Sequence, residues 1–121
     1  MKKQDLIMVV IHVKNDPEHI RHNYILSPFE FAILRGLVSL HFSSEIQIAD
    51  VVRAARMFNK DLDAGRAYTP LRNLLAKKLI TASKKFLPTR RFSTLVSLRS
   101  FLCYSTNVDS IAVLTEEQQV I

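Results

Sequence analysis

The sequence predicts an α+β protein that is mostly helical, with a three-helix core and a small β wing. Apolar residues recur at helical spacing in three segments, which predicts helices over residues 28–42, 45–59 and 66–79. Two short segments after the third helix, residues 80–84 and 110–114, have the composition of strands. Three helices followed by a small pair of strands define the predicted fold class.

A chain of 121 residues has the length of one domain with one core. We expect a single domain over residues 1–121, with residues 1–25 as an N-terminal extension and residues 26–117 as the core.

The N-terminal segment 5–13 is rich in β-branched residues and predicts a buried strand, although a short buried helix fits the same pattern. Asn15, Asp16 and Pro17 then signal a turn, because the residue before a proline avoids helical angles. Residues 16–26 are polar and predict a linker or an irregular loop.

The first helix has a strong start signal. Ser27 can cap the helix, Pro28 suits the first helical position, and Glu30 completes a capping box. Gly36 lies in the middle of this helix, where glycine costs about 1 kcal/mol relative to alanine. A close approach of another helix would explain it. The helix is expected to end near Phe42.

The third helix has one apolar edge, and its other side is polar and basic. Leu71, Leu74, Leu75 and Leu79 recur on one face. Thr69 and Pro70 resemble a cap followed by a first-turn proline. An earlier start near Ala64 is the alternative, but Pro70 must lie within the first turn of the helix or kink it.

Residues 84–91 predict a basic loop, and residues 92–103 fit a helix better than a strand because strict alternation fails there. A last short helix is expected from Thr115, which resembles a cap followed by acidic residues.

The net charge of +6 is concentrated in one part of the chain. Residues 61–104 carry nine basic and two acidic residues, which is the electrostatic footprint of a nucleic-acid face. A solvated basic surface or a patch for an acidic protein partner explains the charge equally well.

Several classes of protein are disfavoured by composition. The longest apolar run is far shorter than a membrane-spanning helix, so we expect no membrane association. Cys103 is the single cysteine, which excludes an intrachain disulfide and makes a cytoplasmic location the default. Its apolar neighbours predict a buried thiol.

Three segments resemble winged helix-turn-helix transcription regulators of the MarR and PadR type. Residues 26–34 resemble their first helix, residues 68–80 resemble their recognition helix and its exit, and residues 111–117 resemble the returning wing strand and the start of the next helix. The resemblance implies a sequence-specific regulator that binds double-stranded DNA as a homodimer, with helix 66–79 in the major groove. Such a regulator would be associated with the nucleoid when bound to DNA. We expect dimer contacts through residues 6–13 or the predicted helix 92–103.

In such a domain, Arg72 and Asn73 would read base edges, because arginine pairs with guanine and asparagine with adenine. Thr69 and Tyr68 would contact phosphate, and the wing would contact the backbone or minor groove. Tyr68 could equally pack on the second helix, and Lys77 could be a solvated charge near a helix end. The predicted DNA-binding residues are Arg66, Tyr68, Thr69, Arg72, Asn73, Lys77, Lys84, Lys85, Arg90 and Arg91.

No catalytic motif accompanies these residues, so we expect neither an enzyme nor a cofactor. The two glycines, Gly36 and Gly65, exclude a glycine-rich phosphate loop. His19 and His22 have a ligand-like spacing without further ligands, and we expect no metal site. The alternatives to DNA binding are a protein-interaction module on the same fold and, ranked last, RNA binding.

Overall fold

The computed structural model describes residues 6–13, 21–40, 45–91 and 95–113, and these form an α+β fold with two antiparallel sheets. The elements in chain order are β1 (Ile7–Val13), β2 (Arg21–Leu26), α1 (Pro28–Ser39), α2 (Ile48–Ala55), α3 (Ala64–Ala76), β3 (Ile80–Arg91), β4 (Leu95–Thr106) and β5 (Val108–Val113). Helix and strand have comparable shares of the described chain, so the prediction of a mostly helical protein is wrong.

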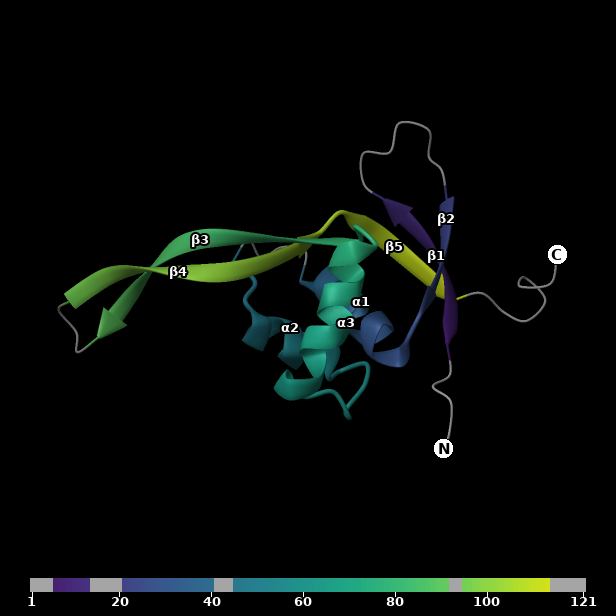
Figure 1. Ribbon diagram of the computed structural model, residues 1–121, viewed down its shortest axis with the longest axis horizontal. Helices are drawn as coiled ribbons and strands as arrows, with labels where there is room; N and C mark the ends of the chain where they lie inside the picture. The colour runs from purple at the N-terminus through teal and green to yellow at the C-terminus, as the bar shows by residue number, and fades with distance from the viewer. Residues whose placement is uncertain (1–5, 14–20, 41–44, 92–94, 114–121) are drawn as a thin grey trace.

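The three helices lie between the two sheets (Figure 1). The β3–β4 hairpin extends away from the helices on one side, and the sheet β2-β1-β5 lies on the other. Helix α3 is nearest the viewer in Figure 1, in front of α1 and α2. This arrangement places α3 and the base of the hairpin on one face of the molecule.

Helix α1 starts as its sequence predicts. The Ser27 hydroxyl accepts from the Glu30 N–H at 3.2 Å, and the Ser27 N–H donates to the Glu30 carboxylate at 3.2 Å, which completes the capping box. The close helix approach predicted at Gly36 is also confirmed. A Cβ built there would lie 2.9 Å from the backbone nitrogen of Ala55 in α2.

Helix α3 starts earlier than the cap signal at Thr69 indicated. The Asp63 carboxylate accepts from the Arg66 N–H at 2.8 Å, so the helix begins at Ala64 and Pro70 lies inside it. Proline has no N–H for the carbonyl one turn back, yet Pro70 is buried on the core side of α3. The aspartate cap six residues earlier therefore overrides the threonine–proline signal.

The exit from α3 is a Schellman motif without its usual glycine. The Lys78 N–H donates to the Leu75 carbonyl at 3.0 Å, and the Leu79 N–H donates to the Leu74 carbonyl at 3.1 Å. Lys78 has a φ of 62°, in the left-handed region that glycine adopts most easily. This turn directs the chain from α3 straight into β3.

The segment after α3 is a long hairpin, which overturns two predictions. β3 extends to Arg91, so residues 84–91 are strand rather than loop. The described part of the predicted helix 92–103 belongs to β4, whose residues pair with β3 from Ile80↔Thr106 to Arg91↔Leu95. Alternation of apolar and polar residues identifies a strand only when one face of the strand covers a core. Most of this hairpin stands clear of the core, so the sequence pattern did not predict its strands (Figure 1).

The base of the hairpin is anchored by Tyr104. Ile46, between α1 and α2, forms an isolated antiparallel bridge with Tyr104, whose N–H donates to the Ile46 carbonyl at 2.7 Å. Both side chains are buried, and Cys103 is buried beside them as predicted. The hairpin is thus continuous with the helical core at this point.

The second sheet joins the two ends of the described chain. β1 pairs with β2 and β5, which confirms the strand alternative for the N-terminal segment. β2 occupies part of the predicted loop 16–26, and that prediction is wrong over residues 21–26. β5 pairs with β1 and not with residues 80–84, because β4 takes that place.

One hydrophobic cluster connects both sheets and all three helices. Its members are Val9, Ile11, Leu26, Ala32, Ile33, Leu34, Leu37, Ile46, Val51, Ala55, Leu62, Ala67, Leu71, Leu74, Leu79, Ile80, Tyr104 and Val108. β1 contributes Val9 and Ile11 to this cluster and β2 contributes Leu26, so both strands share a core with the helices. The predicted helix end at Phe42, the helix from Thr115, and His19 lie outside the described residues.

Candidate nucleic-acid interface

Helix α3 turns one side to the core and the opposite side outward. Its buried residues are Ala67, Pro70, Leu71 and Leu74, which fixes the rotation of the helix. The side opposite them is exposed and consists of Gly65, Tyr68, Thr69, Arg72 and Ala76. We call these five residues the outer face of α3. Three of the predicted DNA-binding residues, Tyr68, Thr69 and Arg72, belong to it.

Tyr68 also forms one wall of a groove between α2 and α3. Its side chain is 55% exposed, so it is neither fully packed on α2 nor free of it. The groove has a volume of about 560 Å³ and is lined by Ile48, Ala49, Val52, Arg53, Arg56, Ala64 and Tyr68. Its floor is apolar, and both charged residues that line it are arginines.

Arg66 lies at the start of α3 and interacts with the acidic turn before it. Its side chain lies 3.8 Å from the Asp63 carboxylate and donates to the Asp61 carbonyl at 3.4 Å. Both partners of the ion pair are exposed, so the pair is worth little and can be exchanged for another anion. Arg66 therefore stays available at the rim of the outer face.

Asn73 and Lys77 are tied to α1 by Glu30. The Asn73 amide nitrogen donates to one Glu30 oxygen at 3.0 Å, and the Lys77 ammonium donates to the other at 2.9 Å. Lys77 also donates to the Ile25 carbonyl at 3.3 Å. Lys77 is thus an anchor between α3 and α1, whereas Asn73 keeps an exposed position beside the outer face.

Glu30 is the buried charged residue of the described chain, with 5% of its surface exposed. Burial alone would raise the pKa of its carboxyl group, but hydrogen bonds from Lys77, Asn73 and the Ser27 N–H, together with the Lys77 charge, outweigh burial and lower the pKa. Glu30 is therefore ionised near neutral pH and acts only as an acceptor.

This lowered pKa predicts acid sensitivity. Since the folded carboxyl group has a lower pKa than the unfolded one, its contribution to stability is complete above the unfolded pKa of about 4.5 and is lost as the pH falls through the folded pKa. We expect Glu30→Gln to lose less unfolding free energy than the wild type between about pH 5 and pH 3 in denaturant titrations. Parallel losses in the two proteins would contradict a stabilising Glu30 carboxylate.

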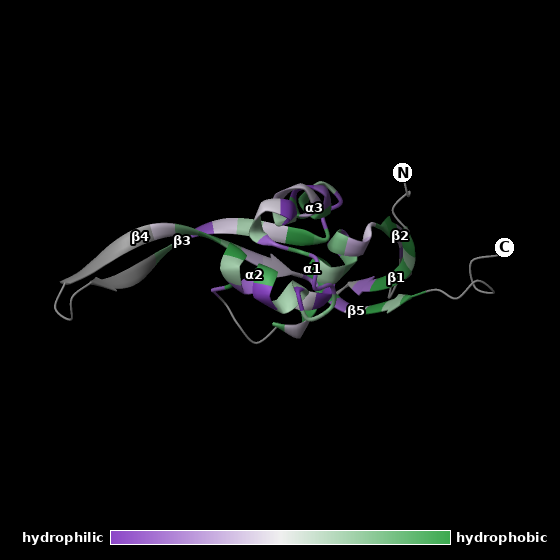
Figure 2. Cartoon of the chain, turned by 90° about the horizontal axis from the view of Figure 1, so that it is seen from below, coloured by the Kyte–Doolittle hydropathy of each residue, from purple (hydrophilic) through white to green (hydrophobic). Residues whose placement is uncertain are grey.

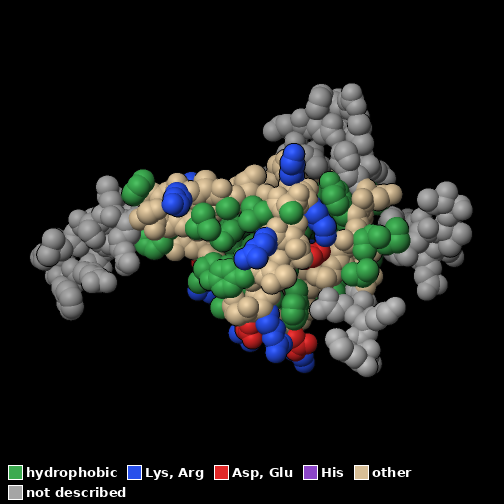
Figure 3. Space-filling model, in the orientation of Figure 1, with side chains coloured by type: hydrophobic (Ala, Val, Ile, Leu, Met, Phe, Trp, Pro, Cys, Tyr) green, Lys and Arg blue, Asp and Glu red, His purple; other side chains and the backbone are tan. Residues whose placement is uncertain are grey.

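The basic residues after α3 lie along the hairpin. Lys84 is exposed on β3, and Lys85 beside it is partly buried. Arg90 and Arg91 occupy the far end of β3, opposite Val96 and Leu95 of β4. Figure 3 shows Lys and Arg side chains distributed over the face on which α3 lies, with hydrophobic side chains gathered beside them.

Two residues of this region have roles that the sequence did not reveal. Lys78 is exposed at the junction of α3 and β3 and has a positive φ, whereas the neighbouring Lys77 is partly buried and bound to Glu30. Glu30 was identified as a capping residue, but its partners on α3 lie 43 and 47 positions away in the sequence. No local pattern indicates such a distant contact.

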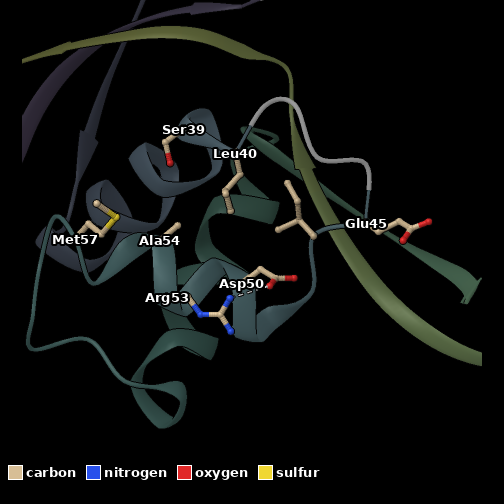
Figure 4. A pocket seen from close by; sticks show the side chains of 8 residues that line it. Ser39, Leu40, Glu45, Asp50, Arg53, Ala54 and Met57 are labelled. Carbon is tan, nitrogen blue, oxygen red and sulfur yellow. Dashed lines mark ion pairs between the residues drawn. The ribbon is translucent and has the colours of Figure 1, made fainter. Parts of the chain in front are cut away.

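A further hollow of about 290 Å³ lies between the end of α1 and α2 (Figure 4). It is lined by Ser39, Leu40, Glu45, Ile46, Asp50, Arg53, Ala54 and Met57. Arg53 and Asp50 form an ion pair at 3.6 Å beside it. Because its lining includes two carboxylates, this hollow does not favour a polyanion.

No protein-family model, curated protein or solved structure matches the chain. Within residues 6–13, 21–40, 45–91 and 95–113, no group of three or more His, Cys, Asp or Glu residues is placed to hold a metal ion. In the same part of the chain, no helix is both long and apolar enough to cross a membrane.

Proposed function

We propose that the chain is a sequence-specific transcription regulator of the cytoplasm that binds double-stranded DNA through α3 and the β3–β4 hairpin. In this proposal α3 enters the major groove and the hairpin acts as a wing beside it. The succession of three helices and a hairpin supports the resemblance to winged helix-turn-helix regulators.

Charge is the observation that carries this proposal. Residues 64–108 include α3 and the whole hairpin, and they contain nine basic residues and no acidic residue. The two elements are contiguous, because the Schellman turn at Lys78 connects them directly. A continuous cationic helix and hairpin is the form in which proteins meet a phosphate backbone.

The dimensions of the elements suit the duplex. Thirteen residues give α3 a length of about 20 Å, and the major groove admits one α-helix or one two-stranded ribbon. The small residues Gly65 and Ala76 on the outer face allow the helix backbone to approach closely. Arg72 is placed between them, where it can reach the base edges.

The structure modifies the roles expected of single residues. Arg72 is the best placed base-reading residue, and Thr69 and Tyr68 are exposed one turn before it. Lys77 is engaged by Glu30, so we assign the phosphate contact near the end of α3 to the exposed Lys78 instead. The left-handed backbone of Lys78 is a strained conformation for a residue with a side chain, which is consistent with a functional role at this position.

The side of the β2-β1-β5 sheet that points away from the core is our proposed dimer interface. Val9 points to the core, so Met8 and Val10 point to the opposite side of β1. Their partners across the sheet, Ile25 and Ala112, are exposed. Figure 2 shows the hydrophobic character of β1 at this end of the molecule, whereas β2 is hydrophobic only at Ile25 and Leu26. Sedimentation should show a dimer, and a monomer would contradict this part of the proposal.

A mobility-shift titration tests the DNA-binding proposal. The purified chain is expected to bind a random-sequence duplex at about 50 mM salt and to lose most of that affinity at about 200 mM, because phosphate contacts release counterions. A pool of duplexes with randomised positions should then yield a preferred site. Absence of binding at the lower salt concentration would overturn the proposal.

The groove between α2 and α3 supports one alternative, a protein-interaction module. Its apolar floor and its two arginines fit an acidic amphipathic peptide. This alternative would be favoured if the chain does not bind duplex DNA at low salt but binds such a peptide, and if Val52→Glu abolishes the binding of the peptide.

A further inference from the structure

Glu30 is placed to control the orientation of Asn73, a predicted base-reading residue, without itself contacting DNA. It is buried in α1, and its carboxylate meets the flank of α3 beside the outer face. Three donors converge on it: the Ser27 N–H and the Lys77 ammonium at one oxygen, and the Asn73 amide at the other. Two of these three donors come from α3.

The chemistry of the contact fixes the orientation of the Asn73 amide. An ionised carboxylate can only accept hydrogen bonds, so the NH₂ end of Asn73 must face Glu30 and the carbonyl end must face away. Lys77 at 2.9 Å keeps the carboxylate charged, which removes the alternative in which Glu30 donates to the Asn73 oxygen. The two ends of the amide are therefore not interchangeable.

An amide held in this way retains the groups that pair with adenine. Adenine presents an acceptor and a donor in the major groove, and asparagine matches them with its NH₂ and its carbonyl oxygen. One NH₂ hydrogen of Asn73 is used by Glu30, which leaves the second hydrogen and the oxygen. A base with the opposite order of donor and acceptor would require the amide to flip.

We propose that Glu30 is a positioning residue that holds the Asn73 amide in one orientation and so gives the DNA interface a preference for adenine at one position. This inference rests on the proposed function, because it assigns a base preference to the same interface. It predicts that substitution of Glu30 changes selectivity more than total affinity.

Glu30→Gln tests the inference, because glutamine has nearly the same shape but can donate as well as accept. The probe is the duplex that the wild type selects from the randomised pool, compared with the same duplex carrying G·C in place of the preferred A·T pair. We expect discrimination between the two duplexes to fall by roughly tenfold in Glu30→Gln. Their average affinity should change much less.

Two variants separate positioning from general destabilisation. Asp50→Asn is the matched control, because Asp50 completes the capping box of α2 through the Gln47 N–H at 3.1 Å but forms no described bond to α3. It should keep the discrimination of the wild type. In an Asn73→Ala background, Glu30→Gln should have no additional effect on discrimination.

A measurement without DNA gives an independent result. In NMR spectra of the free protein, the two hydrogens of the Asn73 amide should differ in shift and exchange rate, and Glu30→Gln should reduce that difference. Unchanged Asn73 amide signals in Glu30→Gln, or unchanged discrimination in a wild type that prefers adenine, would overturn the inference alone. A wild type that binds no duplex would overturn the proposed function together with the adenine preference.

Discussion

Replacing Gly36 with alanine is expected to lower the free energy of unfolding by about 1–3 kcal/mol, although alanine is the better helix former. The added Cβ would lie 2.9 Å from the Ala55 nitrogen and 3.1 Å from the Ala54 carbonyl carbon. These are backbone atoms of α2, which cannot rotate out of the way as a side chain can. Relief requires α1 and α2 to move apart, and this opens the core around Leu37 and Val51.

Gly65→Ala is the matched control, because it introduces the same methyl group at the other glycine. A Cβ there would meet only the Asp63 side chain at 3.5 Å, an ordinary contact on the exposed side of α3. We expect this variant to gain up to about 1 kcal/mol of stability. Thermal unfolding followed by circular dichroism compares the two variants. Equal shifts of Tm would contradict a close packing of α1 on α2 at Gly36.

Replacing Arg72 with alanine is expected to remove most of the sequence preference of the proposed DNA complex. The Arg72 side chain lies at the centre of the outer face of α3, and a bidentate arginine–guanine contact is worth about 1–3 kcal/mol of discrimination. Since Arg72 is exposed, its loss should leave the fold unchanged. Competition between the selected duplex and random-sequence duplex measures this effect.

Lys84→Ala controls for the loss of a positive charge, because Lys84 is also exposed but lies on the hairpin. It should weaken binding to all duplexes alike and reduce the slope of log affinity against log salt by about 1. Equal losses of preference in the Arg72 and Lys84 variants would contradict the separate roles assigned to α3 and the hairpin.

The parts of the fold that the sequence predicted correctly depend on short-range contacts. The capping box joins Ser27 to Glu30 within one turn, and Gly36 indicated a close helix approach because no local reason explained it. Two start signals competed at α3, and Asp63 rather than Thr69 provides the cap. Propensity alone could not decide between them.

The errors arise where a strand does not cover the core with one regular face. The far part of the β3–β4 hairpin stands clear of the helices, so apolar and polar residues there need not alternate. β2 lies at an edge of its sheet and reads as a polar segment before Tyr24. At the candidate site, exposure of Arg72 and Thr69 followed from helical spacing, whereas the engagement of Lys77 by Glu30 did not.

The pairing of β1 with β5 has a consequence for how the chain acquires its fold during synthesis. Val9 and Val113 are neighbours in the sheet, although roughly a hundred positions of sequence separate them, and closing so large a loop carries an entropic cost. On a ribosome, β1, the central strand of this sheet, emerges long before its edge partner β5 exists. The helices and the hairpin can assemble from local contacts, but the β2-β1-β5 sheet is completed only after β5 has been synthesised.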